Sequence, residues 1–516
     1  MYPGDVVSLQ RCQIGGISMS IGLQVKGMAH GVDRALFNSC RRTAAVLIAV
    51  LSLGILLLPT PSFAAGRVLY AAPTGAGSAC SSASPCSVAN AVAAAGAGDS
   101  VILLAGSYGD VTIRGGGGTA AAPITVAPAA GATATFGRLG TYSPYVTWRS
   151  ITVTVTFYIY STAAGTTVDA AKLNGGGMFL RSTNVTVRNS IFQNGVSLDA
   201  LQISSAKNVL IEHNTVRDYN QSGTTGYHAD CIQIYDSVGV TLRGNNLRNC
   251  YNSAIIFSPG QGKGISNVLI ESNFVQGCLV KSAKCSNGNN LDLRYSSVSN
   301  ITVRNNTFLT GTVRLTSPGV VFDRNIVDYL SDCGAVMTNS VVSSWNKGMC
   351  ARPASIGTRG NRQGVVPVQD KATGNLHLLT AGSARITPFA GPVPAPRDYD
   401  GKAMLAELAG ADSVAGSSGP ADITRPAVAI VSPSNGSAIT GKVTLKASAT
   451  DNVGVSNVRF LVQSTALGEA ALQSGTWNLS VNTAGFGSGT YAVTAQATDL
   501  SGNTTISAPI TFNLRN

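Results

Sequence analysis

Charged residues are scarce in this sequence: Asp, Glu, Lys and Arg together make up 12% of its 516 residues. So few charges argue against many long surface helices, and the middle of the chain is instead rich in Gly, Val, Ile, Thr, Ser and Asn. This composition favours many short strands joined by turns, so we predict an all-β protein. The length exceeds the size at which single hydrophobic cores usually stop growing, which predicts two folded units.

An apolar run long enough to span a membrane is not evident. The segment TAAVLIAVLSLGILLL is shorter than the roughly 20 residues that a membrane-spanning helix needs. It follows Arg34, Arg41 and Arg42 and ends at Pro59, just before the small-residue site SFAA. This pattern is typical of a secretory signal peptide, with a membrane anchor as the alternative. We predict that residues 1–65 are a leader, that no membrane span remains after its cleavage, and that a bacterial-type export route makes the protein secreted or cell-surface.

Histidine is rare, with four residues in the chain, and the cysteine spacings fit no common zinc pattern. Eight of the ten cysteines follow the leader, an even number that indicates disulfides formed in an oxidising compartment. Their closeness in the sequence predicts four local pairs: Cys80 with Cys86, Cys231 with Cys250, Cys278 with Cys285, and Cys333 with Cys350.

Acidic residues are outnumbered, and the formal net charge is +12. A basic protein favours an anionic partner. For an exported protein we expect an acidic polysaccharide and no nucleic acid.

One phrase recurs through the middle of the chain at intervals of roughly 20 to 33 residues, which is typical of a parallel β-helix. The copies are NVTVRNSIF at 184, NVLIEHNTV at 208, GVTLRGNNL at 239, NVLIESNFV at 267, NITVRNNTF at 300 and GVVFDRNIV at 319. Stacking them predicts three columns. One is an inward apolar column (Val187, Ile211, Leu242, Ile270, Val303, Phe322). The second is an asparagine ladder at the turn (Asn214, Asn245, Asn273, Asn306, Asn325), and the third an outward column of alternating charge (Arg188, Glu212, Arg243, Glu271, Arg304, Asp323).

A second strand precedes each phrase. The copies are ALQIS at 200, CIQIY at 231, AIIFS at 254, NLDLR at 290, TVRLT at 312 and AVMTN at 335. Alternation sends their aliphatic residues inward and leaves polar residues outward, without a regular charge pattern. We expect a functional face here, with outward columns Gln202, Gln233, Ile256, Asp292, Arg314 and Ser204, Tyr235, Ser258, Arg294, Thr316.

Across residues 66–412 the chain resembles the secreted right-handed parallel β-helix proteins of the pectate-lyase-like superfamily. The stretch from LYAAPTGAG to VTIRG is similar to their N-terminal cap, with a helix near 88–96, and NLHLLTAGSARI and RDYDGKA are similar to their closing segment. After a linker at 413–424, residues 425–516 alternate short strands and turns, as in a small β-sandwich. Their turns ATDNVGV and ATDLSGN resemble those of bacterial immunoglobulin-like modules.

The superfamily resemblance implies cleavage of an acidic polysaccharide by β-elimination, which needs a cation on the uronate carboxylate and groups that transfer protons. Arg294 and Arg314 suit the first role because guanidinium binds carboxylate through two bonds. We name Tyr235, His228, Lys281 and Lys284 as proton-transfer candidates, with Gln202, Gln233, Asp292 and the two lysines as substrate contacts.

The stretch LRYSSVSNITVRNNTFLTGTVRLTS is loosely similar to the alginate lyase and chondroitinase B family, which implies that Arg294 lies near that family's lysine and Arg314 at its arginine. The lysine itself and the glutamates of that family's calcium site are not found. Asp199, Asp230 and Asn289 could offer oxygen ligands to Ca²⁺, with turn formation as the alternative.

We therefore predict a monomeric, secreted polysaccharide lyase. The alternatives are a glycoside hydrolase or epimerase on the same fold, or a non-catalytic cell-surface or glycan-binding protein.

Overall fold

The computed structural model describes residues 11–14, 17–20, 66–223, 229–350, 352–389, 394–413, 424–451, 455–462, 465–473, 475–499 and 504–515. In the N-terminal part of the chain, β1 (Arg11–Ile14) and β2 (Ile17–Ser20) pair as antiparallel strands. The predicted signal peptide's apolar run and most of the predicted linker lie outside the described residues.

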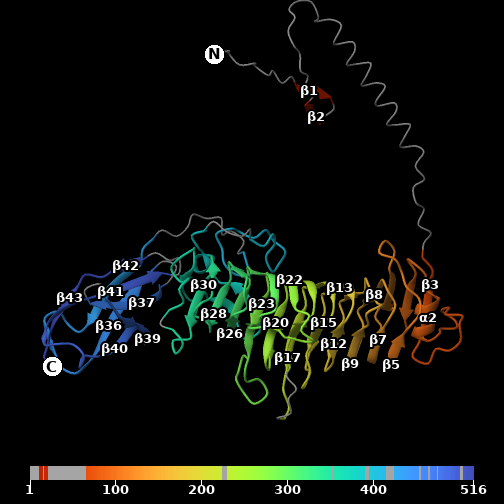
Figure 1. Ribbon diagram of the computed structural model, residues 1–516, viewed down its shortest axis with the longest axis horizontal. Coiled ribbons are helices and arrows are strands. Elements are labelled where there is room, and N and C mark those ends of the chain that lie inside the picture. The colour runs from red at the N-terminus through yellow and green to blue at the C-terminus, as the bar shows by residue number, and fades with distance from the viewer. Residues whose placement is uncertain are drawn as a thin grey trace, which may run out of the picture. The chain divides into compact units, whose positions relative to one another are not determined.

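Parallel strands stack coil upon coil between residues 68 and 363 (Figure 1). One wall is a twelve-stranded parallel sheet, which we call the ladder sheet. Its strands are β3 (Val68–Ala71), β4 (Ser100–Leu103), β6 (Ile124–Pro128), β8 (Val146–Arg149), β10 (Thr167–Asp169), β13 (Thr183–Arg188), β16 (Lys207–Glu212), β19 (Val238–Arg243), β22 (Ile265–Glu271), β25 (Val298–Arg304), β27 (Val320–Asp323) and β29 (Met337–Thr338).

The remaining walls begin in three long strands, β5 (Gly106–Ile113), β7 (Ala134–Thr141) and β9 (Thr152–Ile159). After β9 they separate into two stacks. One stack holds β12 (Gly177–Leu180), β15 (Leu201–Ser204), β18 (Ile232–Tyr235), β21 (Ser253–Phe257) and β24 (Asn289–Leu293). The other holds β11 (Lys172–Asn174), β14 (Ile191–Gln193), β17 (Thr215–Tyr219), β20 (Asn246–Cys250) and β23 (Phe274–Gln276).

The two stacks meet again in β26 (Thr307–Leu315), which pairs with both β23 and β24. From there β28 (Ile326–Leu330), β30 (Val341–Trp345) and β31 (Arg362–Gln363) continue the wall. A coil therefore has three sides around one core.

Two details of the repeat prediction were wrong. Each recurring phrase is not one strand but two, because the backbone turns at the ladder asparagine: NVLIEHNTV supplies the end of β16 and the start of β17. AVMTN was predicted to continue the stack that contains β15, β18, β21 and β24, and it does not. Its Met337 pairs with Phe322 of β27, so β29 belongs to the ladder sheet. Alternation looks the same in both walls, and so it could not distinguish them.

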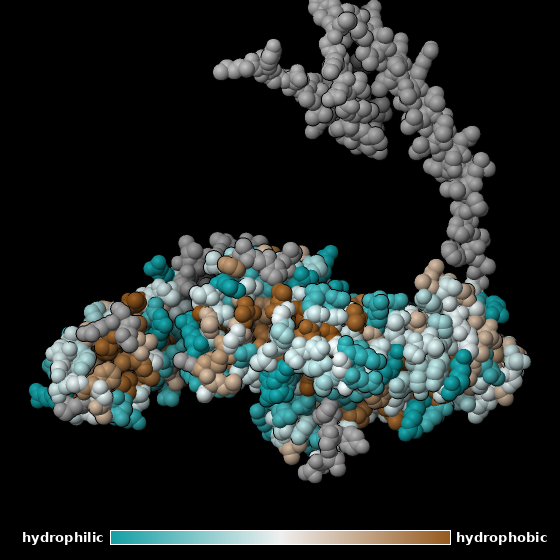
Figure 2. Space-filling model, viewed as in Figure 1, coloured by the Kyte–Doolittle hydropathy of each residue, from teal (hydrophilic) through white to brown (hydrophobic). Residues whose placement is uncertain are grey.

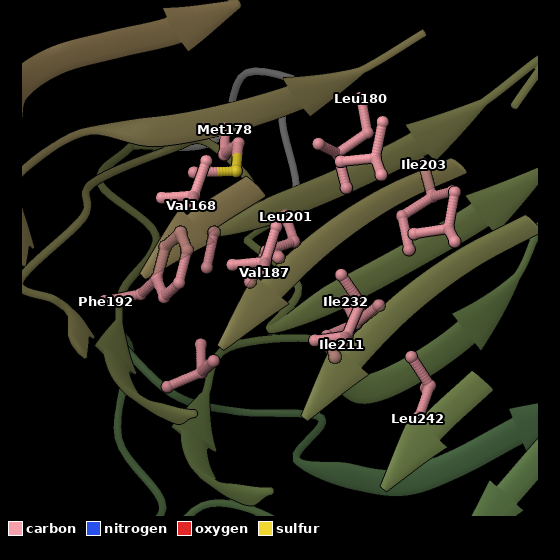
Figure 3. Packing of buried hydrophobic residues seen from close by; sticks show 14 of the residues in the cluster. Val168, Met178, Leu180, Val187, Phe192, Leu201, Ile203, Ile211, Ile232 and Leu242 are labelled. Atoms are coloured by element: carbon pink, nitrogen blue, oxygen red, sulfur yellow. The ribbon is translucent and has the colours of Figure 1, made fainter. Parts of the chain in front are cut away.

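The interior is apolar, as the inward columns predicted. Val187, Ile211 and Leu242 are aligned in register and fully buried. Opposite them, inward residues of the stack that contains β15 and β18, such as Leu201 and Ile232, are also fully buried. The two sets of side chains point into one shared core (Figure 3).

The predicted asparagine ladder is present and continuous. The Oδ1 atom of Asn245 accepts from the backbone N–H of Asn214 at 3.0 Å and from its Nδ2 at 3.1 Å. The Nδ2 of Asn245 donates to the carbonyl oxygen of Ile211 at 2.8 Å. The same bonds recur from Asn245 to Asn273, from Asn273 to Asn306 and from Asn306 to Asn325. This ladder satisfies backbone groups that every turn would otherwise bury without a partner.

Two segments outside the repeats cover the coil stack, one at its N-terminal end and one along its side. The predicted N-terminal helix is α2 (Val88–Ala94), which begins after Ser87, whose side chain accepts from the N–H of Asn90. The closing segment comprises β32 (Val368–Asp370), β33 (Asn375–Leu378), the 3₁₀ turn η1 (Gly382–Ala384) and residues 394–413. It forms a second apolar cluster with Phe274 and Ile326, which point outward from β23 and β28, so it covers the side of several coils and not their end, unlike the predicted cap. All four predicted disulfides are formed, with S–S distances of 1.97 to 2.18 Å.

The C-terminal region consists of two sheets. One holds β34 (Ala427–Ser432), β36 (Lys442–Thr450), β39 (Ala471–Gln473) and β40 (Thr476–Asn482), all antiparallel. The other holds β35 (Ser437–Ile439), β37 (Val455–Val462), β38 (Thr465–Glu469), β41 (Gly489–Asp499), β42 (Thr504–Ile506) and β43 (Ile510–Leu514). Buried Leu445, Phe460 and Val493 belong to its own core, as an immunoglobulin-like sandwich requires.

Candidate functional site

The outward side of β12, β15, β18, β21, β24 and β26, which we call the candidate face, carries the polar columns predicted from the sequence. The strand register aligns Gln202 with Gln233, Gln233 with Ile256, Ile256 with Asp292 and Asp292 with Arg314. It also aligns Ser204 with Tyr235. Parallel pairing therefore places Gln202, Gln233, Ile256, Asp292 and Arg314 on one side of consecutive coils, one strand spacing apart.

Arg294 and Arg314 both face Asp292. The Nε and Nη2 atoms of Arg294 donate to the two carboxylate oxygens of Asp292 at 2.6 and 2.7 Å, while Nη1 of Arg314 lies 3.8 Å from Oδ2. The Asp292 side chain is 3% exposed, and its hydrogen bond and charge raise the pKa of the Arg294 guanidinium. Arg294 is thus tied to a buried carboxylate, whereas the more weakly paired Arg314 keeps more of its donor capacity for a ligand.

Tyr235 lies in a hydrogen-bonded group with Gln202 and a residue that the sequence analysis did not name, Arg181. The Tyr235 hydroxyl donates to Oε1 of Gln202 at 2.8 Å, and Nη2 of Arg181 donates to the hydroxyl at 3.1 Å and also to Oε1 of Gln202. Backbone contacts hold Arg181 in place, since its Nη1 donates to the carbonyls of Leu180 and Gln202. Arg181 could have been found by extending the Ser204 and Tyr235 column one coil toward the N-terminus, where GMFLRS has the same alternation.

A chain of hydrogen bonds between side chains, made by two glutamine amides, links this group to the next coils. Nε2 of Gln202 donates to Oε1 of Gln233 at 3.1 Å, and Nε2 of Gln233 donates to the hydroxyl of Ser258 at 3.1 Å. These bonds fix the orientation of both amides, so that the candidate face is preorganised before any ligand binds.

The three proposed calcium ligands lie in turn positions. Oδ1 of Asp199 accepts from the backbone N–H of Asp230 at 2.9 Å, and Oδ1 of Asp230 accepts from Nδ2 of Asn252 at 2.9 Å. Nδ2 of Asn289 donates to the carbonyl of Asn252 at 3.1 Å. These carboxylates join one coil to the next, as the turn alternative expects, and calcium binding by this set stays a prediction.

The remaining proton-transfer candidates are less closely placed. Lys281 and Lys284 are exposed in the loop closed by Cys278 and Cys285, and His228 lies outside the described residues. Tyr235 is therefore the proton-transfer candidate with defined partners on the candidate face.

Two surface hollows begin where the arginine-bearing strands end. One, of about 350 Å³, is lined by Ser296 to Ser299 and Lys263, and the other, of about 410 Å³, by Leu315 to Val320 and Asp332. Figure 2 shows that the visible side of the coils is mostly polar, with apolar patches between the polar groups. The two hollows lie just after β24 and β26, beside residues of the ladder-sheet strands β22, β25 and β27.

A separate cluster of metal-ligand type lies in the C-terminal closing segment. Within the described ranges, His377, Asp400 and Asp412 form the one group of three His, Cys, Asp or Glu side chains with ligand atoms within 4.8 Å of one another. Asp400 already pairs with Lys402 at 3.0 Å and with Nε2 of His377 at 3.1 Å. These bonds tie the closing segment together.

No helix in the part of the chain that the structure describes is long and apolar enough to cross a membrane.

Comparison with known proteins agrees with both folded regions. The family model for the right-handed beta helix region matches residues 157–308, and that for the bacterial Ig domain matches residues 426–495. A search of curated proteins finds no significant match.

Three solved structures are similar to parts of the chain. Fibronectin(III)-like modules of CbhA from Clostridium thermocellum share 20% identity with a TM-score of 0.16, over 17% of this chain and 94% of theirs. An endo-beta-1,4-mannanase from Thermotoga petrophila shares 12% identity with a TM-score of 0.17, over 37% of this chain and 39% of the mannanase chain. A rhamnogalacturonan lyase shares 13% identity with a TM-score of 0.29, over 53% of this chain and 87% of the lyase chain.

At these values the structural similarities carry no conclusion about activity, and the family models identify the regions. The chain thus contains a right-handed parallel β-helix followed by a bacterial immunoglobulin-like domain, in the order that its sequence patterns predicted.

Proposed function

We propose that this protein is a secreted polysaccharide lyase that cleaves an acidic, uronate-containing glycan by β-elimination on the candidate face. The observation that carries the proposal is the placement of Tyr235, Gln202 and Arg181 in one hydrogen-bonded group on the same face as Arg314. The face thus offers both a group that transfers protons and cations that bind carboxylate.

The chemistry assigns a role to each group. A base removes the proton from C5 of the uronate, the electrons of that C–H bond form the C4=C5 double bond, and the C4–O bond breaks. The leaving oxygen then takes a proton. Arg181, which donates to the Tyr235 hydroxyl, would neutralise the carboxylate of the uronate that is cleaved, which makes its C5 proton more acidic. Arg314 lies five strands further along the stack, at about 24 Å, so it would bind the carboxylate of another uronate of the same chain. Tyr235, in its deprotonated form, would take the C5 proton as the base and then give it to the leaving oxygen, and its bonds to Gln202 and Arg181 would hold the phenol oxygen in one position.

Arg294 has a supporting role in this proposal. Because its guanidinium is engaged with Asp292 through two hydrogen bonds, it fixes the carboxylate that Arg314 also faces. Arg294→Ala would leave the buried Asp292 carboxylate with Arg314 as a weaker partner. A lower activity of this variant would then come both from displacement of the Asp292 side chain and from the lost positive charge.

The test is incubation of the full-length protein with pectate, alginate and glycosaminoglycans, with and without chelator, while ultraviolet absorbance follows unsaturated product. We expect product from at least one glycan, at least a hundredfold lower rate, to order of magnitude, for Arg181→Ala, and a smaller loss for Arg314→Ala. Arg188→Ala is the matched control, because Arg188 lies on the ladder sheet at a similar side-chain exposure, 41% against 34% for Arg314. Wild-type activity in both Arg314→Ala and Arg294→Ala would refute the site assignment.

A non-catalytic glycan-binding protein is the second candidate. The close Asp292 and Arg294 pair favours it, because part of the positive charge on the face is already neutralised. Glycan binding without unsaturated or hydrolysed product in the same panel would support this function over the lyase. Hydrolysed product without a double bond would instead indicate a glycoside hydrolase, and a changed uronate with an intact chain an epimerase.

A further inference from the structure

The outward columns of the candidate face continue toward the N-terminal coils, where aromatic residues replace the amides. The register aligns Gln202 with Phe179, and Phe179 with Tyr158. Tyr142 and Tyr160 directly follow the inward Thr141 and Ile159 of β7 and β9, so they also point outward. We call Tyr142, Tyr158, Tyr160 and Phe179 the aromatic strip. None of these four residues has a role in the proposed lyase chemistry.

The four rings form one stack. The ring centroids of Tyr142 and Tyr160 are 3.9 Å apart with an interplanar angle of 6°, and those of Tyr158 and Tyr160 are 4.1 Å apart at 27°. Phe179 continues the stack at 5.7 Å from Tyr158. Because the rings cover much of one another's faces, the strip presents mainly ring edges and phenol hydroxyls, which are hydrogen-bonding groups on a rigid support.

An arginine lies at each end of the stack. The guanidinium carbon of Arg114 is 4.6 Å from the Tyr142 ring centroid, and that of Arg181 is 5.5 Å from Phe179 and 5.7 Å from Tyr158. Among the residues that the structure describes, neither arginine lies within ion-pair distance of a carboxylate. Arg181 also bonds to Tyr235, so the strip is continuous with the candidate face.

We propose that the aromatic strip, with Arg114, is an extended binding site for the part of an acidic polysaccharide chain that is not cleaved, and that it begins beside Arg181. The acidic ligand class rests on the proposed function. Arg114, which has no ion-pair partner among the described residues, complements a carboxylate of such a chain, and the tyrosine hydroxyls complement its sugar hydroxyls. Coils follow one another at about 4.8 Å, close to the length of one sugar unit, so a chain along the coil axis meets a new set of groups at each coil.

The test compares wild type with the triple variant Arg114→Gln, Tyr142→Phe, Tyr160→Phe, which keeps both rings and removes one charge and two hydroxyls. Affinity electrophoresis in gels that contain pectate, alginate or chondroitin sulfate, with dextran as the neutral glycan, measures binding without turnover. Arg149→Gln is the matched control, since Arg149 is also exposed but lies on the ladder sheet. Circular dichroism melting checks the fold, and Arg114→Lys tests charge without the guanidinium.

We expect wild type and Arg149→Gln to bind at least one of the acidic glycans and not dextran, and the triple variant to lose about tenfold or more in affinity for the long chain. Binding of trimers of the same glycan should stay unchanged, because they fit on the candidate face alone. Equal affinity of wild type and the triple variant for the long chain would overturn the proposal, as would an equal loss for trimers.

Turnover is measured separately, so the two proposals can fail independently. If wild type binds an acidic glycan through the strip but releases no unsaturated product, the lyase proposal fails and the strip stands. If unsaturated product forms and the triple variant matches wild type on long chains, the strip fails and the lyase stands.

Discussion

The ladder sheet and the candidate face are built from the same repeats but differ in how their outward side chains are used. On the ladder sheet, Glu271 lies between Arg243 and Arg304 at 2.6 and 2.7 Å, and its side chain is 1% exposed. On the candidate face, outward residues change in type from coil to coil, and arginines such as Arg181 have no carboxylate partner among the residues described. Regular repetition therefore marks groups that stabilise the coil, and departure from repetition marks groups available to a ligand.

The largest expected effect is the loss of lyase activity in Tyr235→Phe, which tests whether the candidate face, unlike the ladder sheet, is functional. Removing the hydroxyl takes away the proposed proton-transfer group, so we expect a rate about a thousandfold lower on the active glycan. The ring remains, so the melting temperature should stay close to that of wild type. Release of unsaturated product and a thermal melt measure the two quantities, and a fully active variant would exclude Tyr235 from the mechanism.

On the structural side, Asn245→Ala should destabilise the coil without a specific effect on turnover. The change leaves the N–H of Asn214 and the carbonyl of Ile211 buried without their partner, which costs about 3 kcal/mol of unfolding free energy. Denaturant titration measures the loss. The control is Asn184→Ala, in the exposed Asn184 and Asn208 pair, where the loss should be clearly smaller.

Glu271→Gln tests the charge ladder with an intermediate effect. The amide keeps the shape of the carboxylate but loses its charge to Arg243 and Arg304, so we expect a loss of about 2 kcal/mol in unfolding free energy. Activity per folded molecule should be unchanged. An unchanged denaturation midpoint would show that the alternating charges do not stabilise the coil.

The smallest expected effect is a pH dependence at Asp169. Burial alone would raise the pKa of this carboxyl, but the hydrogen bond from Asn189 and the charges of Arg188 and Arg149 outweigh it and lower the pKa. A lowered pKa stabilises the fold above the pKa of the unfolded chain, and this stability is lost as the pH falls through the folded pKa. Asp169→Asn should therefore lower the melting temperature at pH 7, with a difference from wild type that shrinks below about pH 4. A difference independent of pH would contradict this account.

Much of the fold could be predicted from the sequence because repeats and alternation are local. The inward column from Val187 to Phe322, the asparagine ladder and the four disulfides all follow from spacing along the chain, and the structure contains each of them. The membership of AVMTN could not be predicted, because inward alternation is shared by every wall of the coil.

The candidate site was predicted less completely, for a physical reason. The sequence placed Gln202, Gln233, Asp292 and Arg314 in one outward column, and the register agrees. It treated Arg294 as available for a ligand, whereas in the fold two of its donors bind Asp292. The predicted columns began at Gln202 and Ser204, one coil after Arg181 and up to three coils after the aromatic strip, so neither was included.

By itself, the sequence determined the coil repeat, the direction of each side chain, inward or outward, and the division into a β-helix and an immunoglobulin-like region. These properties depend on a period of two along a strand and on one repeat length, and both are visible in one dimension. Only the tertiary structure decided which outward groups pair with each other and which stay open, because that depends on distances between coils that lie 20 or more residues apart in the chain. The hydrogen bonds from Arg294 to Asp292 and from Arg181 to Tyr235 are two pairings that the sequence patterns did not predict.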